Sequence, residues 1–285
     1  ARRVVAYIVL VAISILCLFW FYVLFINSTR SHSELTSGFQ ALPNFKNFKF
    51  VTQFFTNFKN LMAGTLPIWN GLLNSIIVAG SCAILSTYFS TMTAYAIHAY
   101  EFKLKKAIFT FILMVMMIPT QVTALGFINL ITDMKLDNTF IPLIVPAIAA
   151  PATFFYMKQY MESTLPLAII EAARIDGASN GQVFRKITLP LVLYQTMPLI
   201  IMSFAHNINN FGAIFFLTGG EPNVADSTTT YAKGTDIVVT WIYKLTVNMQ
   251  QYHYAAVLAV CIFIVLAPFS IWNFRNTKSF KEGEM

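Results

Sequence analysis

The chain has 285 residues, of which 57% are hydrophobic and only 11% are charged. This composition is too apolar and too poor in charge for a soluble domain of that size, so it predicts a membrane protein. A net charge of +7 is also compatible with nucleic-acid binding, but the basic residues gather in particular loops. The positive-inside rule accounts for that distribution without nucleic acid.

Six apolar runs are long enough to cross about 30 Å of hydrocarbon as helices of roughly 20 residues. They cover residues 4–26, 73–99, 107–131, 140–160, 191–217 and 254–274. The first run follows two arginines, but its apolar core is too long for a signal peptide and no cleavage site stands out, so we expect a retained span. The predicted fold is an all-α polytopic membrane protein with six transmembrane helices.

The basic residues fall unevenly on the two sides of these runs. Twelve of the 19 lysines and arginines lie in the N-terminus, the second and fourth loops and the C-terminus, and seven lie in the other loops. By the positive-inside rule, the richer side is cytoplasmic. We therefore expect both termini and the loop of about 161–190 in the cytoplasm.

Several classes of chemistry lack their sequence signals. All 12 acidic residues lie outside the runs or at their ends, whereas ion-coupled carriers commonly place ionisable groups near mid-membrane. Cys17, Cys82 and Cys261 lie singly in three spans, without the spacing of a metal or redox site. The chain has no Gly-Lys-Ser or Gly-Lys-Thr sequence, so any ATP would be hydrolysed by another subunit. We expect neither a metal nor a cofactor in this chain.

Two extracellular connections are expected to carry amphipathic helices. Residues 27–71 interleave phenylalanines with lysines, which favours a helix lying at the membrane surface over a dedicated partner site. The loop of about 219–252 opens on a glycine-rich turn. Within it, an apolar face is formed by Ile237, Val238, Trp241, Ile242 and Leu245. We expect this second helix to rest at the outer membrane interface.

Small residues and prolines predict close packing and bends inside the spans. The second span has a small residue at every fourth position: Ser75, Ala79, Ala83, Thr87 and Thr91. Such a face lets a neighbouring helix approach closely. The third span contains Pro119, and the fourth contains three further prolines. Prolines bend helices and free backbone carbonyls, which suits a chain that surrounds a cavity.

The fifth span is the most polar. Ser203, His206, Asn207 and Asn210 have the spacing i, i+3, i+4 and i+7, which predicts one shared helix face, whereas Asn209 points elsewhere. Amides and hydroxyls are costly in hydrocarbon unless they are satisfied. They therefore either bond neighbouring helices or face a watery cavity, and the residues alone slightly favour interhelical bonds.

A charged stretch between the fourth and fifth spans predicts a rigid unit of helix, elbow and helix. Thr164 is placed to cap a short helix beginning at the next proline, and Gly177 to end it in a left-handed turn. Ser179 and Gln182 have capping-box spacing for the second helix, which Pro190 is expected to end.

The same stretch carries a spaced motif. It reads Glu-Ala-Ala, three residues, Gly, nine residues, then an apolar residue, any residue, Leu and Pro, and it is formed by Glu171, Ala172, Ala173, Gly177, Ile187, Leu189 and Pro190. This resembles the cytoplasmic coupling loop of bacterial ABC-importer permeases and implies their type I, MetI-like fold. The resemblance implies that the ATPase contact is made by Glu171, Ala172, Ala173, Arg174, Asp176 and Gly177. The alanines would permit close docking, and the glycine would set the elbow angle.

The segment from Ser203 to Phe211 resembles the substrate-lining segment of maltose/maltodextrin-type permeases. The resemblance implies that a sugar is contacted by Ser203, His206, Asn207, Asn210, Thr120 and Thr153, with Gln121 as an alternative in the third span. His206 departs from that family, whose members carry an aromatic residue there. Amide groups beside aromatic rings suit a carbohydrate, which offers hydroxyls at its edge and apolar faces for stacking.

Together these resemblances imply a permease subunit of a binding-protein-dependent importer in the bacterial cytoplasmic membrane. It would move a sugar such as a maltodextrin by alternating access and would itself not be an enzyme. The implied partners are a second homologous permease, two copies of an ABC ATPase subunit that binds ATP and Mg, and an extracellular solute-binding protein.

Alternative functions are a permease for glycerol phosphate or a polyamine, an ion-coupled carrier, an intramembrane enzyme and a membrane scaffold. We expect residues 1–71 to form the first span and an interfacial segment. Residues 72–285 are expected to form the permease domain.

Overall fold

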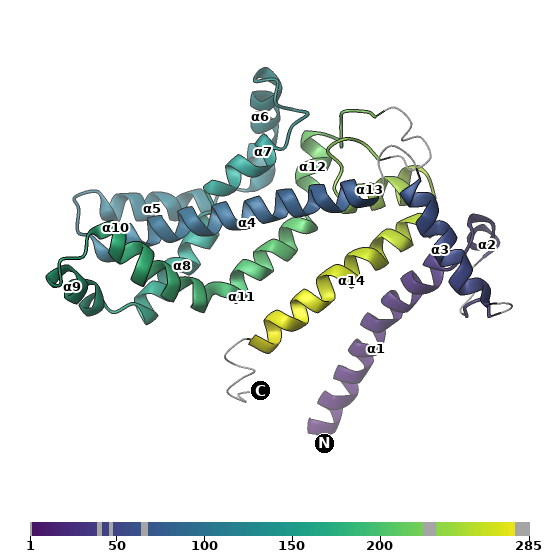
Figure 1. Cartoon of the computed structure of the whole chain (residues 1–285), viewed down its shortest axis with the longest axis horizontal. Helices are drawn as coiled ribbons and strands as arrows, with labels where there is room; N and C mark the ends of the chain where they lie inside the picture. The colour runs from purple at the N-terminus through teal and green to yellow at the C-terminus, as the bar shows by residue number, and fades with distance from the viewer. Residues whose placement is uncertain (1, 39–41, 46–47, 64–67, 225–231, 277–285) are drawn as a thin grey trace. The chain divides into compact units, whose positions relative to one another are not determined.

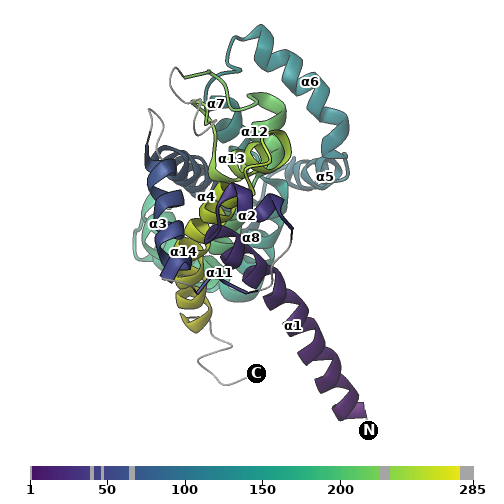
Figure 2. The ribbon, with the colours of Figure 1, turned by 90° about the vertical axis from the view of Figure 1, so that its right-hand side faces the viewer.

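The computed structural model describes residues 2–38, 42–45, 48–63, 68–224 and 232–276, and within these ranges the chain is helical without a strand (Figures 1 and 2). The predicted all-α class is confirmed. The chain divides into two compact units, residues 1–74 with 220–269 and residues 75–219 with 270–285.

Four helical runs of the described residues are long and apolar enough to cross a membrane. They are Arg3–Ser28, Ile68–Ala99, Ile141–Ser163 and Tyr252–Trp272. These correspond to the first, second, fourth and sixth predicted runs. The apolar composition that predicted a membrane protein is thus organised into helices of spanning length.

The third and fifth predicted runs are each divided into two helices. The third consists of α5 (Lys105–Met116) and α6 (Thr120–Asp133), and the fifth of α11 (Leu189–Ile208) and α12 (Phe211–Leu217). Pro119 has an extended backbone between α5 and α6, and α6 turns away from α5 there (Figures 1 and 2). The bend predicted at Pro119 is confirmed, because proline cannot continue the hydrogen-bond ladder, whereas the break in the fifth run was not predicted.

The first unit is built around one apolar cluster. Its elements are α1 (Arg2–Ser28), α2 (His32–Thr36), α3 (Lys49–Met62), the start of α4 (Ile68–Ala99), α13 (Val238–Tyr243), the π-helical η5 (Lys244–Asn248) and most of α14 (Tyr252–Asn276). Leu61, Trp241, Leu245 and Leu258 are wholly buried at its centre. The buried Asn57 amide donates to the carbonyls of Ser28 (3.0 Å) and Arg30 (2.8 Å), which ties α3 to the end of α1.

Both predicted amphipathic helices exist, and the second buries its apolar face in the protein. α3 packs Phe54 and Phe58 on the apolar cluster and leaves Phe55 exposed. In contrast, Trp241 of α13 and Leu245 of η5 are 0% exposed. Their apolar face packs on the protein itself, and a position of this helix at the outer membrane interface stays a prediction. The same amphipathic pattern serves either surface, and the sequence alone does not distinguish them.

The second unit holds most of α4 and the remaining helices. They are α5, α6, α7 (Ile141–Ile144), the 3₁₀ helix η2 (Val145–Ile148), α8 (Pro151–Thr164), α9 (Leu167–Ile175), α10 (Asn180–Val183), the π-helical η3 (Phe184–Thr188), α11 and α12. α8 packs against α5 and α11. Tyr95, Met157, Ile170, Val183 and Val192 share one buried core drawn from α4, α8, α9, α10 and α11.

The predicted small-residue face of α4 is confirmed as a packing face. Its five members are no more than 5% exposed. On the same helix, the Cys82 thiol donates to the Leu143 carbonyl at 3.5 Å, and the Ser90 hydroxyl to the Ala150 carbonyl at 3.4 Å. Small side chains thus let α4 approach the proline-rich backbone of α7 to α8 closely.

Candidate coupling segment and cargo cavity

The short helix α9 is closed at its end by a glycine turn. Gly177 has φ +82°, and the N–H groups of Gly177 and Ala178 donate to the carbonyls of Arg174 and Ala173, both at 3.0 Å. This is the Schellman arrangement, which satisfies the last carbonyls of a helix and requires a left-handed residue at this position. The predicted left-handed turn at Gly177, which ends α9, is confirmed.

α9 has one buried face and one charged, exposed face. Ile170 is 1% exposed and the half-buried Ala173 packs on the same core. Glu171, Ala172, Arg174, Asp176 and Gly177 are exposed. Among described residues, the carboxylates of Glu171 and Asp176 form neither a hydrogen bond nor an ion pair. A rigid helix therefore presents unpaired charge to the outside.

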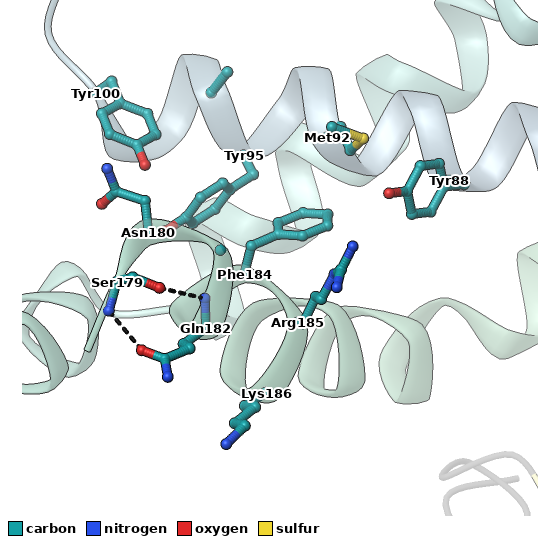
Figure 3. A pocket seen from close by; sticks show the side chains of 12 residues that line it. Tyr88, Met92, Tyr95, Tyr100, Ser179, Asn180, Gln182, Phe184, Arg185 and Lys186 are labelled. Atoms are coloured by element: carbon teal, nitrogen blue, oxygen red, sulfur yellow. Dashed lines mark hydrogen bonds between the residues drawn. The ribbon is translucent and has the colours of Figure 1, made fainter.

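The beginning of α9 and the course of the following helix differ from the predictions. α8 continues through Thr164, and α9 begins at Leu167 after an extended Pro166, so the expected Thr164 cap is wrong. The Ser179–Gln182 capping box is confirmed by two hydrogen bonds of 2.8 and 3.3 Å (Figure 3). Pro190 does not end this helix. It lies in the first turn of α11, and the helical backbone continues through it directly from the π-helical η3.

Two contacts join α9 and the end of α8 to the end of α4. The Arg174 guanidinium lies over the Tyr100 ring, 5.1 Å from its centre. The His98 Nε2 is 3.0 Å from the Leu165 carbonyl, at the junction between α8 and α9. A push on α9 would therefore reach α4 through side-chain contacts, as well as α11 through the chain itself.

The polar stripe of the fifth span is interrupted by the end of its helix. α11 ends at Ile208, and Asn210 precedes α12 outside α11, so the prediction of one helical face for all four residues is wrong. The amides of Asn207 and Asn209 donate to the carbonyls of Ser203 (2.8 Å) and Ala205 (3.0 Å). Asparagine side chains that bond to nearby backbone compete with helix continuation.

A small cavity brings together two of the predicted sugar-facing residues. Thr153 of α8 and Ser203 of α11 line a space of about 160 Å³. Thr87 of α4 and Tyr156 of α8 line it too, together with apolar side chains. Hydroxyls beside an aromatic ring can bind a neutral polar solute. The described lining contains no titratable group placed for proton transfer apart from the phenol of Tyr156.

The remaining predicted cargo residues are distributed differently. His206, Asn207 and Asn210 are not among the described residues that line this cavity; His206 is exposed, and the other two are half-buried. The side chains of Thr120 and Gln121 lie outside what the structure describes. Two further lining residues were not predicted to contact cargo. The sequence indicates Thr87 only as part of the packing face of α4, and it marks Tyr156 only as a residue within a span.

The fold and these two sites define a class: an all-helical, multi-pass membrane protein with a protruding, capped helix pair. Residues 86–275 match the sequence pattern of the family described as "Binding-protein-dependent transport system inner membrane component". The match covers more than half of the chain. The chain therefore belongs to this family of transporter membrane subunits.

Relatives in sequence and structure carry transport descriptions. The "Galactooligosaccharides transport system permease protein GanP" of Bacillus subtilis (strain 168) is 41% identical over 53% of this chain and 35% of its own length. The "Maltodextrin transport system permease protein MdxF" of the same strain is 28% identical over 86% and 60%. The chain thus spans about a third to three fifths of these two relatives.

A solved structure shows the same fold. A chain of a bacterial ABC transporter involved in the import of the acidic polysaccharide alginate superposes with a TM-score of 0.77 at 17% identity. The superposition covers 97% of this chain and 96% of that chain. At this identity the likeness concerns the fold, and it agrees with the predicted importer-permease architecture.

Proposed function

We propose that this chain is the permease subunit of an ATP-driven sugar importer and that α9 is the element through which a separate ATPase subunit acts. The observation that carries the proposal is the construction of α9. It is short and closed by a Schellman turn, anchored by Ile170, and its carboxylates at Glu171 and Asp176 are unpaired in the described chain. Such a helix can transmit motion because it is stiff, and it can dock because the carboxylates of Glu171 and Asp176 are exposed.

The proposed cargo is a neutral sugar, with oligosaccharides such as maltodextrins as the first candidates. The described lining of the cavity offers the hydroxyls of Thr87, Thr153 and Ser203 and the ring of Tyr156. Among those lining residues no cation is present to meet a phosphate, and no carboxylate to meet a polyamine. This chemistry favours a sugar over glycerol phosphate or a polyamine.

A second permease subunit is part of the proposal because the cavity is small. Its volume of about 160 Å³ falls below the roughly 300–1,000 Å³ of ordinary small-molecule pockets. One chain thus supplies part of a binding surface, and a homologous partner would supply the rest. An extracellular binding protein would deliver the sugar, and ATP and Mg would be bound by the ATPase subunits.

Sugar-dependent ATP hydrolysis tests the function directly. The chain would be co-expressed with a candidate second permease and a candidate ATPase subunit, and the purified complex reconstituted with a candidate binding protein in nanodiscs. We expect maltodextrins or related oligosaccharides to stimulate the ATPase activity. Stimulation by glycerol phosphate or a polyamine, with none by any sugar, would contradict the proposed cargo. Failure of an ATPase subunit to co-purify would contradict the importer function.

Replacing Gly177 with proline tests the coupling role of α9. Proline fixes φ near −65°, whereas Gly177 has φ +82°, so Gly177→Pro must change the elbow. We expect membrane insertion to persist while uptake into reconstituted vesicles falls by at least about tenfold and ATP hydrolysis becomes independent of the sugar. Gly181→Ala is the matched control, because a Cβ there meets open space. Undiminished uptake by Gly177→Pro would refute the coupling role.

Removing single hydroxyls tests the cargo cavity. We expect Thr153→Val and Ser203→Ala each to weaken sugar uptake by about three- to tenfold, the cost of one hydrogen bond. Thr110→Val on the exposed part of α5 serves as control. Asn207→Leu and Asn210→Leu examine the predicted residues outside this cavity in the same assay. If the variants instead lose the assembled complex, these polar groups bond helices rather than cargo.

A further inference from the structure

A second, larger cavity lies where α4 meets the second helix of the coupling segment. It has a volume of about 660 Å³ and shares no residue with the cargo cavity. Tyr88, Met92 and Ala96 line it from α4, and Phe184 and Arg185 line it from η3 (Figure 3). The cavity is therefore bounded by a helix of membrane-spanning length and by the segment proposed to lie at the cytoplasmic surface.

The cavity has an uncompensated positive charge. Figure 3 shows the Arg185 side chain pointing from η3 toward α4, whereas Lys186, which also belongs to the lining, points away from α4. Arg185 makes no ion pair or hydrogen bond with a described residue, and no aspartate or glutamate belongs to the described lining. A guanidinium in such surroundings favours a phosphate, which it binds through two parallel hydrogen bonds.

The side of the cavity formed by α4 and Phe184 is apolar and aromatic, whereas Ser179, Asn180, Gln182 and Lys186 add polar groups on the other side. On α4, Tyr88 is 38% and Met92 41% exposed. The Phe184 ring lies 6.4 Å from the ring of Tyr88 and 5.5 Å from that of Tyr95. A free phosphate ion would neutralise Arg185 but leave this surface uncovered. A ligand that joins a phosphate to a hydrocarbon chain would cover both.

We infer that this cavity binds an anionic phospholipid of the cytoplasmic leaflet, with its phosphate on Arg185 and the start of an acyl chain along Tyr88 and Met92. A zwitterionic lipid fits less well, because the described lining offers no carboxylate to its ammonium group. Basic pockets beside spanning helices on the cytoplasmic side are sites where anionic headgroups bind. The inference rests on the proposed membrane orientation of the coupling segment. It does not require that the cargo is a sugar.

Lipid retention by the assembled complex tests this site without any transport measurement. The co-expressed complex in detergent would be titrated with fluorescent phosphatidylglycerol and, separately, with fluorescent phosphatidylcholine. We expect Arg185→Gln to weaken phosphatidylglycerol binding by about fivefold, the effect of one basic residue near a charged headgroup. Lys106→Gln is the matched control, because it removes an exposed charge of α5 outside the described lining, and it should leave this binding within twofold.

A second variant tests the apolar part without changing charge. Ala96→Phe places a ring in the cavity, and we expect this variant to bind phosphatidylglycerol more weakly. In a separate competition experiment on the unmodified complex, we expect inorganic phosphate at millimolar concentration not to displace the lipid. Equal effects of Arg185→Gln and Lys106→Gln, full binding by Ala96→Phe, or displacement by inorganic phosphate would overturn the inference. Loss of the ATPase or the second permease from Arg185→Gln would also overturn it, since the cavity would then be a protein contact. A failed sugar assay with intact lipid selectivity would affect only the proposed cargo.

Discussion

The segment around α13 and the segment around α9 both combine charged residues with a glycine at positive φ, but they use them in opposite ways. Gly220 has φ +86° and Gly177 has φ +82°. Next to Gly220, the Asp236 residue is 1% exposed and its carboxylate is paired with Lys244. Next to Gly177, the carboxylate of Asp176 is exposed. The buried pair of Asp236 and Lys244 stabilises the conformation of its own segment, whereas the exposed carboxylate of Asp176 remains available to a partner protein.

The α13 segment is closed by a dense hydrogen-bond network. The two oxygens of the Asp236 carboxylate accept from the Lys244 ammonium at 2.7 and 2.9 Å, and they also accept from the Thr240 hydroxyl and the Lys233 N–H, each at 2.9 Å. Burial lowers the pKa of the Lys244 ammonium, and the Asp236 carboxylate opposes that shift. The pair is therefore held by its mutual attraction in a site that would otherwise disfavour either charge.

Breaking this buried pair should have the largest effect on stability. Asp236→Ala leaves the Lys244 ammonium buried without a counter-charge and the Lys233 N–H without its acceptor. We expect a loss of about 3–5 kcal/mol in the free energy of unfolding. Thermal unfolding of the purified complex in one detergent measures it as a lowered Tm.

Two controls separate the loss of the pair from the cost of an isolated charge. The double variant Asp236→Leu with Lys244→Met removes both charges and should lose less than Asp236→Ala alone, because no unpaired ion remains. Glu101→Ala breaks the Lys105 pair, whose acid is 89% exposed, and should change stability by no more than about 0.5 kcal/mol. A double variant less stable than Asp236→Ala would contradict the buried-charge explanation.

The two glycines predict a second, smaller difference. A Cβ added at Gly220 would overlap the Asp236 carboxylate and the Lys244 ammonium, whereas a Cβ at Gly177 meets nothing within 4 Å. Both positions require a left-handed backbone. We expect Gly220→Ala to cost about 2–4 kcal/mol, from backbone strain and overpacking together, and Gly177→Ala only about 1 kcal/mol.

The same unfolding assay compares these glycine variants side by side. Gly181→Ala, in open space without a positive φ, provides the reference for a harmless glycine substitution. Similar losses for Gly220→Ala and Gly177→Ala would show that the two turns are equally constrained. That outcome would remove the proposed difference between an internally packed loop and an exposed elbow.

Local sequence signals predicted the helix ends that depend on neighbouring residues. The Gly177 turn and the Ser179–Gln182 capping box follow from residues within a few positions of each other, and both are present. The expected stop at Pro190 failed because η3 turns directly into α11, where a proline in the first turn is acceptable. Whether a proline ends or begins a helix depends on the turn before it, which the sequence pattern did not reveal.

The cargo residues were only partly predictable for a similar reason. The periodic pattern predicted that Asn210 shares a helix face with Ser203. In the structure, the side chains of Asn207 and Asn209 bond to backbone carbonyls four residues earlier, and α11 ends between these two asparagines, at Ile208. The meeting of Thr153 with Ser203 depends on the packing of α8 against α11. Composition and spacing did not predict that these two residues line one cavity. Only the resemblance to maltose/maltodextrin-type permeases named both of them as sugar-facing residues.

The smallest expected effect concerns an exposed charge pair in the same unit as Asp236. The Glu34 carboxylate lies 2.7 Å from the Lys49 ammonium, and the Ser31 N–H also donates to it at 3.0 Å. Hydrogen bonding to Lys49 is the main cause that lowers the pKa of Glu34 from 4.5 to about 2. A carboxyl whose pKa falls on folding stabilises the folded state above pH 4.5, and this contribution disappears as the pH falls through about 2.

Because the Lys49 side chain is 48% exposed, we expect Glu34→Gln to cost only about 0.5–1 kcal/mol at pH 7. Urea unfolding between pH 2 and 7 should show the difference between the two proteins narrowing below pH 4.5. A difference that stays constant down to pH 2 would show that Glu34 acts through its shape and hydrogen bonds rather than its charge.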